Sequence, residues 1–174
     1  MPEIEFSVSL TTRKPRGSEI DGTDYHFVSE DEFIRRRDAG ELAEWAQVFD
    51  ARYGTLRSPL DGAIQSGRDI LLDIDIQGAA QIRAKYQNDS VAVFVLPPTF
   101  EDLAQRLRKR GTDTEEAIAR RLHRSREEAR SYIQYDYLII NDDVDASVER
   151  FRSIVIAERS RVARLRESFA PWKS

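Results

Sequence analysis

Two arginines follow a short apolar segment near the start of the chain, in a polar turn whose residue types suit phosphate binding. The segment 4–8 has the character of a buried strand, and it leads into Ser9, Arg13 and Arg16. In open α/β sheets, ligands bind beyond the carboxyl ends of the strands. Guanidinium forks at that place can grip phosphate oxygens two at a time. The spacing therefore predicts a phosphate-binding turn.

Polar side chains also follow the later predicted strands. Asp73 and Asp75 come after one apolar segment, and Asn141 comes after another. Because the carboxyl ends of parallel strands meet at one edge of a sheet, we expect a single crevice to collect them. An aspartate that ends an apolar strand is also the form of a carboxylate near Mg²⁺ in phosphoryl-transfer enzymes. The alternative is that these strands simply end in polar turns.

Three further arginines could neutralise charge on a polyphosphate. Arg106 and Arg110 lie four residues apart on one face of a predicted helix. Arg121 lies beyond Gly111, in the segment 111–133, whose thin apolar stripe predicts a mobile lid. The alternative is a solvated basic face, and that alternative is favoured for the neighbouring Arg120, Arg124, Arg126 and Arg130.

A set of acceptors, phenols and a hydroxyl lies in the segment that follows the arginine turn. Guanine presents its N1–H and 2-amino groups as adjacent donors, and one carboxylate can accept from both. Glu44 precedes Trp45 on a predicted core strand, so its carboxylate should face the other side. An ordinary exposed glutamate is the alternative. The rest of the set is Tyr25, Tyr53, Thr55 and Asp75.

The elements that must position these residues alternate between strands and helices. Four short β-branched segments predict buried parallel strands joined by crossover helices. Residues 24–66 interrupt this alternation and predict a small α+β insert with short antiparallel strands and a helix capped by Ser29. The predicted parallel strands are Ile4–Ser9, Asp69–Ile74, Val91–Leu96 and Tyr137–Ile140, and the predicted helices are Ser29–Ala39, Gly78–Tyr86, Phe100–Arg110 and Asp145 to about Arg166.

The composition of the chain limits the classes of protein to which it can belong. The chain has 174 residues, 40% hydrophobic and 33% charged, which suits one domain with a core. A net charge of −4 argues against general nucleic-acid binding. No apolar run reaches membrane-spanning length. The absence of cysteine excludes disulfides and thiolate metal sites, and it fits a cytoplasmic enzyme.

Taken in order, several segments resemble one known family, the guanylate kinases. The matching segments are FSVSLTTRKPR from Phe6, EIDGTDYHFVS from Glu19, ELAEW from Glu41, YGT from Tyr53, LDIDIQG from Leu72, Leu96-Pro97-Pro98, RKRGTDTEE from Arg108, Arg120–Leu122 and Asn141-Asp142-Asp143. The resemblance covers residues 4 to about 160. It implies a P-loop-kinase-type α/β fold, with a parallel sheet and helices on both faces.

The resemblance also implies an activity, the ATP-dependent phosphorylation of GMP to GDP with Mg²⁺. It implies a kinase-like domain at 1–160, a GMP-binding insert at 24–66, a lid at 111–133, and a helix end and tail at 161–174. By motif position, Ser9, Arg13, Arg16, Tyr25 and Tyr53 would hold the GMP phosphate, and Glu44, Thr55 and Asp75 would recognise guanine. Arg106, Arg110 and Arg121 would act on the ATP side with Asn141 near adenine, and Asp73 would lie near Mg²⁺.

One family motif is missing from the sequence. A guanylate kinase should open with a strand, a G-x-x-G-x-G-K-[ST] loop and a helix, yet no glycine here is followed by Lys-Ser or Lys-Thr. We therefore expect that a start codon assigned too late, or a fragment, has removed roughly 25–30 residues, the length of a strand–loop–helix unit, and that this chain is inactive alone. The alternatives are a non-catalytic binding module for GMP or phosphorylated partners and a pseudoenzyme. Oligomeric state is not readable from the sequence.

Overall fold

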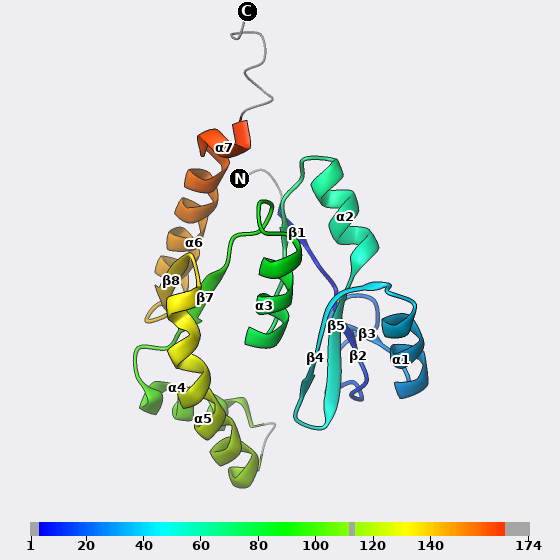
Figure 1. Cartoon of the computed structure of the whole chain (residues 1–174). Helices are drawn as coiled ribbons and strands as arrows, with labels where there is room; N and C mark the ends of the chain where they lie inside the picture. Colours follow the sequence, from blue (N-terminus) through cyan, green and yellow to red (C-terminus); the bar gives the residue numbers. More distant parts are fainter. Residues whose placement is uncertain (1–3, 112–113, 166–174) are drawn as a thin grey trace, which may run out of the picture. The chain divides into compact units, whose positions relative to one another are not determined.

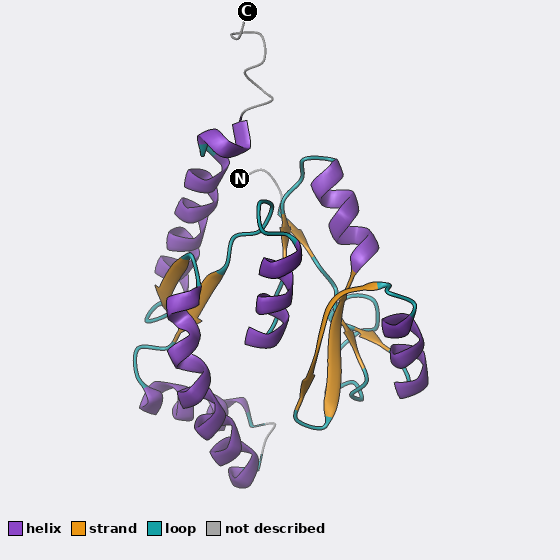
Figure 2. Cartoon of the chain, in the orientation of Figure 1, coloured by secondary structure: helices purple, strands orange, loops and turns teal. Residues whose placement is uncertain are grey.

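The computed structural model describes residues 4–111 and 114–165. The chain divides into two compact units, residues 1–90 and 91–174 (Figure 1). Each unit contains a pair of parallel strands together with helices, which confirms the expected α/β class. Figure 2 distinguishes the helices, strands and loops of both units.

The first unit contains two sheets. One is the parallel pair β1–β6, and the other has four strands in the order β3-β2-β5-β4. The elements of this unit are β1 (Glu5–Phe6), β2 (Leu10–Thr11), β3 (His26–Phe27), α1 (Glu30–Asp38), β4 (Leu42–Val48), β5 (Ala51–Leu56), α2 (Arg57–Gln65), β6 (Ile70–Leu71) and α3 (Ile76–Lys85).

The single strand expected at Ile4–Ser9 is wrong, because the chain there serves both sheets. The Ser7 N–H still donates to the Leu71 carbonyl at 3.0 Å. The partner strand β6 ends at Leu71, so the backbone groups beyond Ser7 need other partners. They find them in β2, where Leu10 pairs with Gly54 of β5.

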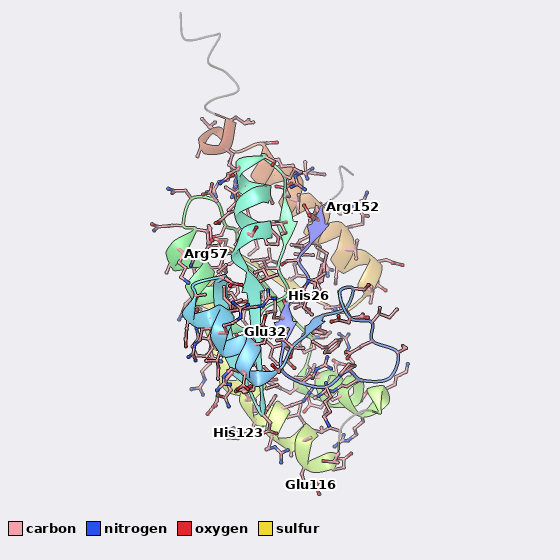
Figure 3. All side chains as sticks on the ribbon, turned by 90° about the vertical axis from the view of Figure 1, so that its right-hand side faces the viewer. His26, Glu32, Arg57, Glu116, His123 and Arg152 are labelled. Atoms are coloured by element: carbon pink, nitrogen blue, oxygen red, sulfur yellow. The ribbon has the colours of Figure 1, made fainter. Side chains whose placement is uncertain are left out.

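The insert follows the expected pattern with two differences. The β4–β5 hairpin is antiparallel as expected, whereas β3 pairs with β2 in parallel. Helix α2 was not expected, although Leu60, Ala63 and Ile64 carry its helical spacing and the first two are buried. Helix α1 begins as expected, with the Ser29 hydroxyl accepting from the Glu32 N–H at 3.2 Å. The Glu32 carboxylate itself pairs with Arg35 and Arg36. Figure 3 labels Glu32 on this helix.

The two faces of the four-stranded sheet differ in chemistry. Side chains alternate along a strand, so Tyr53 and Thr55 of β5 point to one face and Leu56 to the other. The face with Leu56 packs against α1, where the fully buried Phe33 joins Leu10, Leu42 and partly buried neighbours. The opposite face carries the buried polar residues Thr11, Glu44 and Thr55. One face therefore supplies the core, and the other is available for chemistry.

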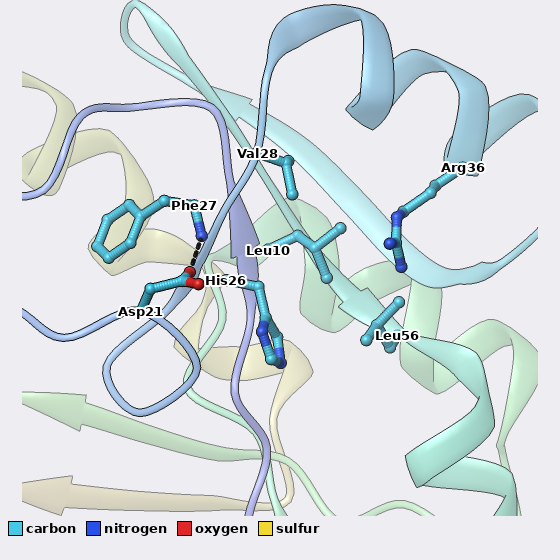
Figure 4. Close-up of a pocket in the computed structure, with 7 residues that line it drawn as sticks. All are labelled: Leu10, Asp21, His26, Phe27, Val28, Arg36 and Leu56. Atoms are coloured by element: carbon cyan, nitrogen blue, oxygen red, sulfur yellow. Dashed lines mark hydrogen bonds between the residues drawn. The ribbon is translucent and has the colours of Figure 1, made fainter.

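A pocket of about 230 Å³ opens at the edge of the α1-side cluster (Figure 4). Leu10, Val28 and Leu56 form its apolar wall, and Arg36 lies at its side. Asp21 lines it as well, and its carboxylate accepts from the Phe27 N–H at 2.8 Å. The Leu10 and Leu56 side chains belong to the sheet face opposite to Tyr53 and Thr55.

Helix α3 covers the outer edge of β4 with side-chain hydrogen bonds. Gln81 contacts both backbone groups of Trp45, accepting from its N–H at 3.3 Å and donating to its carbonyl at 2.6 Å. Lys85 donates to the Ala43 carbonyl at 2.5 Å, and Gln77 donates to the Gln47 carbonyl at 3.3 Å. The three helix residues are four positions apart, a rise of about 6 Å each, and their strand partners are two positions apart, about 7 Å each. The spacing along the helix therefore matches the spacing along the strand. The helix therefore satisfies backbone groups of β4, which is the edge strand of this sheet among the described residues.

The described residues of the second unit form the parallel pair β7–β8, four α-helices and a 3₁₀ turn. The strand Tyr137–Ile140 and the helix Phe100–Arg110 have the bounds that the sequence predicts. Gly111 ends this helix with a φ of +67°. The elements are β7 (Val93–Leu96), α4 (Phe100–Arg110), α5 (Glu115–Ala129), η1 (Arg130–Gln134), β8 (Tyr137–Ile140), α6 (Val144–Arg159) and α7 (Val162–Leu165).

The single terminal helix expected from Asp145 to about Arg166 is broken at Ser160, and its last expected residue lies outside the described residues. Glu158, only 6% exposed, lies two residues before this break. Its carboxylate accepts from the Tyr137 hydroxyl at 2.6 Å and lies 3.2 Å from an Arg161 nitrogen. Arg164 approaches it to 3.4 Å, so the turn after Ser160 lets two arginines neutralise one buried carboxylate.

The segment expected to form a lid, 111–133, contains α5 and most of η1. Ile118 is the buried residue of α5, in keeping with its thin apolar stripe. Arg124 pairs with Glu128, and the Arg126 guanidinium lies 5.3 Å from the centre of the Phe100 ring on α4. These two arginines therefore have partners, where the sequence favoured a solvated face.

In the described ranges, no helix has the length and apolar character needed to cross a membrane.

Replacing Gln81 by methionine should lower the free energy of unfolding by about 1–3 kcal/mol, because two backbone groups of Trp45 lose their partner. Urea unfolding followed by tryptophan fluorescence measures this change. Gln65→Met is the matched control, since Gln65 is an exposed end residue of α2. Equal losses in the two variants would contradict the role given to Gln81.

Candidate functional site

The first part of the site is built around Arg13, in the turn after β2. Its side chain is only 10% exposed, and its fork binds the two oxygens of Glu19 at 2.6 and 2.7 Å. Its Nε donates to the Tyr53 hydroxyl at 3.2 Å, and its guanidinium lies 4.9 Å from the centre of the Tyr25 ring. The structure thus brings three of the predicted phosphate-binding residues together and adds Glu19.

The charges in this cluster shift one another. Arg13 foremost, helped by the Arg16 N–H at 2.7 Å, lowers the pKa of the Glu19 carboxyl to about 2. Burial foremost raises the pKa of the Tyr25 phenol, and the negative charge of Asp73 adds to this. In this cluster an ionised carboxylate therefore forms a bidentate ion pair with a guanidinium.

The other two residues predicted to bind phosphate, Arg16 and Ser9, make fewer side-chain contacts. Arg16 is exposed, and its side chain makes no hydrogen bond or ion pair within the described part of the chain, although its backbone N–H contacts Glu19. Ser9 lies one residue before β2, and its carbonyl accepts from the His26 N–H at 2.9 Å. An exposed, unpaired guanidinium beside a buried one leaves a positive charge available to an anion.

The second part of the site is a buried carboxylate. Glu44 is only 3% exposed, and its Oε1 accepts from the Thr55 hydroxyl at 2.7 Å. Burial foremost raises the pKa of Glu44 and the nearby Asp75 adds to the rise, while the bond from Thr55 opposes it. The bland alternative of an exposed glutamate is therefore wrong. Carboxylates are rarely buried so deeply, and the positive charge of Lys85 nearby offsets part of the rise.

Asp75, the third predicted base-recognition residue, has a structural task as well. It is the N-cap of α3, and its Oδ1 accepts from the Gln77 and Gly78 N–H groups at 3.1 and 3.0 Å. Tyr53 of the arginine cluster and Thr55 of the carboxylate cluster lie two residues apart on β5, so the clusters are about one strand repeat, ~7 Å, apart on one face. This face thus presents a basic end and an acidic end.

Asp73 follows β6 and is exposed. Within the described residues, no group of three or more acidic or histidine side chains could hold a metal ion. Mg²⁺ differs from most metals in this respect, because it is commonly bound through one or two carboxylates together with substrate phosphates. A lone exposed aspartate near the basic cluster fits that mode of binding.

In the second unit, two of the predicted ATP-side residues are in contact. Arg106 of α4 donates to the Asn141 carbonyl at 2.8 Å, just after β8. The Asn141 N–H donates to the Leu96 carbonyl at 2.7 Å, and its side-chain oxygen lies 3.4 Å from the Ser147 hydroxyl. Arg110 ends α4 one turn after Arg106, and Arg121 lies on α5, which packs against α4. Arg106 is therefore fixed beside the end of β8.

The site contains residues that the sequence reasoning did not single out. Glu19 orders the arginine turn, and its signal was an acid six residues after Arg13 in a polar loop. Gly78 contacts Glu44 so closely that a Cβ at this position would lie 2.4 Å from its Oε2. That contact joins residues 34 positions apart in sequence, and no local pattern indicates it.

Comparisons with known proteins agree with one another. A sequence model described as "Guanylate kinase" matches residues 2–158. The guanylate kinase of Syntrophotalea carbinolica is 49% identical over 95% of this chain and 78% of its own length, and that of Chelativorans sp. is 51% identical over 91% and 73%. A crystal structure of guanylate kinase from Anaplasma phagocytophilum has a TM-score of 0.84 at 35% identity, covering 95% of this chain and 83% of that one.

Thr55→Val should weaken the folded state most where Glu44 is ionised, because the hydroxyl donates to a buried carboxylate. We expect a loss of about 1.5–3 kcal/mol in the free energy of unfolding at pH 8, and a smaller loss at pH 5, where protonation competes. Thr11→Val is the control, since Thr11 is equally buried and accepts from the Arg13 N–H instead. A loss that does not change with pH in Thr55→Val would contradict the contact's charged character.

Proposed function

The chain belongs to the guanylate kinase family, whose members transfer a phosphoryl group from ATP to GMP, and we propose that its first unit binds GMP across the polar face of the four-stranded sheet. The observation that carries this proposal is the buried Glu44 on the same face as the Arg13 cluster. One end suits a base with two adjacent donors, and the other suits a phosphate.

The phosphate would lie at Arg13, Tyr25 and Tyr53, joined by Arg16 and Ser9. The Glu19 carboxylate already occupies the fork of Arg13, with two oxygens at 2.6 and 2.7 Å. A phosphate dianion offers the same pair of oxygens with more charge, and the exposed Arg16 supplies a second guanidinium. The Tyr25 and Tyr53 hydroxyls would complete a set of donors.

The base would lie at Glu44, Thr55 and Asp75. Guanine N1–H and its 2-amino group are donors, whereas adenine has an acceptor at N1. An ionised Glu44 therefore accepts from guanine and repels adenine. Because the carboxylate is buried and held by Thr55, it is positioned before the base arrives, which lowers the cost of binding.

The remaining residues would serve the transfer itself. Arg106, Arg110 and Arg121 would neutralise charge that develops on the transferring group, and Asn141 would lie near adenine. Asp73 would hold Mg²⁺ together with nucleotide phosphates, and the metal would supply charge neutralisation there. Residues 24–66 would form the GMP-binding part and residues 111–133 a lid, since phosphoryl transfer needs alignment and exclusion of water more than a nucleophilic side chain.

Two variants separate the two ends of the site. Glu44→Ala should weaken the binding of both GMP and guanosine about 10-fold or more, whereas Arg13→Ala should weaken GMP alone by a similar factor. Calorimetric titration of each variant with both ligands measures the four affinities. The proposal is wrong if Glu44→Ala leaves GMP binding intact, or if Arg13→Ala weakens guanosine as much as GMP.

GMP affinity should rise with pH through the raised pKa of Glu44 and then level off, because only the ionised carboxylate accepts from both guanine donors. Below that pKa each unit of acidification should cost up to about tenfold. The phosphate of GMP titrates near pH 6 as well, so Glu44→Gln serves as the reference. The rise in the unmodified chain should exceed that of Glu44→Gln, and parallel curves would remove Glu44 from base recognition.

A further inference from the structure

Gly78 is the third residue of helix α3, and the backbone gives no reason for a glycine there. Its φ is not positive, so other residues could adopt its conformation. A glycine inside a helix is less favourable than alanine by about 1 kcal/mol. Something other than local conformation must therefore account for the missing side chain.

The space around Gly78 supplies the reason. A Cβ at this position would lie 2.4 Å from Oε2 of Glu44 and 3.0 Å from its Cδ. Real Cβ atoms do not approach an oxygen so closely, so one of the two groups would have to move. The other near atom, Cβ of Ile74 at 3.3 Å, is merely tight. Gly78 thus forms one wall of the space that holds the Glu44 carboxylate.

The helix cannot move away to make room. Gln81 binds both backbone groups of Trp45, the residue after Glu44, and Lys85 binds the carbonyl of Ala43, the residue before it. Asp75 caps the same helical turn through the Gly78 N–H. Because backbone on both sides of Glu44 is tied to α3, a side chain at position 78 would displace the carboxylate and not the helix.

We propose that Gly78 is a positioning residue for guanine recognition: its bare Cα lets the Glu44 carboxylate lie between Thr55 and α3, with one oxygen held by the Thr55 hydroxyl and the other against the helix. This inference rests on the proposed role of Glu44 as the acceptor for guanine. A methyl group at position 78 pushes Oε2 away, breaks the alignment with Thr55 and turns the carboxylate from the base.

Gly78→Ala tests this, with Gly62→Ala as the matched control. Gly62 is also helical, and a Cβ there meets nothing within 4 Å. Calorimetric titrations with GMP and with IMP, which lacks the 2-amino group, give the preference for guanine. We expect Gly78→Ala to lower the GMP-to-IMP preference about tenfold or more and Gly62→Ala to leave it unchanged. A generally destabilised helix would not alter this ratio.

The same substitution in a Glu44→Ala background shows whether Gly78 acts through Glu44. We expect no additional loss of preference in Glu44→Ala/Gly78→Ala, and additive losses would overturn the inference. If Gly78→Ala alone does not fold, recovery of the fold in the double variant supports the steric contact, and failure of both contradicts it. If Glu44→Ala keeps the full preference for GMP over IMP, the proposed base recognition is wrong. If Glu44→Ala loses that preference but Gly78→Ala keeps it, only the role proposed for Gly78 is wrong.

Discussion

Holding a carboxylate inside the protein is the constraint on which the candidate site depends. Glu44 loses almost all of its contact with water, and the bonds from Thr55 and the nearby charge of Lys85 only partly offset that loss. Burial of a charge is unfavourable, and the raised pKa of Glu44 is the electrostatic expression of that penalty. The proposed guanine site would use this penalty, because a base with two N–H groups brings donors to the buried carboxylate.

The arginine end of the same face is arranged in the opposite way. Arg13 is largely buried, yet it has a full set of partners in Glu19, Tyr25 and Tyr53. A guanidinium fixed by an internal carboxylate loses little side-chain entropy on binding, and it does not collapse onto the surface when no ligand is bound. One end of the face is therefore a guanidinium fixed by internal partners, and the other is a carboxylate held inside the protein against the cost of its burial.

Local sequence signals predicted those parts of the molecule that depend on neighbouring residues. Thr99 and Gly111 bracket α4 at both predicted ends, because a cap and a left-handed glycine act within one turn. The first strand was mispredicted, since where β1 gives way to β2 depends on how far β6 extends more than 60 residues later. Strand apolarity gave no information on partner choice, which is also why the parallel pairing of β3 was missed.

The site shows the same division. The family resemblance implied that Arg13 and Tyr53 belong together, and residue types already grouped Glu44 with Thr55; the structure places each pair in contact. Types could not show that Glu19 fills the arginine fork, that Asp75 caps α3, or that Gly78 bounds the carboxylate. These contacts depend on how the helix lies against the strand, and that placement comes from the hydrogen bonds of Gln77, Gln81 and Lys85 to backbone atoms of β4.

Covering β4 with helix side chains also has a consequence for colloidal behaviour. Exposed edge strands are templates on which other chains can add strands and aggregate. Here amide and ammonium groups on every fourth residue of α3 occupy carbonyls along that edge, so a foreign strand would have to compete with them. The same three side chains that hold α3 against β4 thus also protect this edge from self-association.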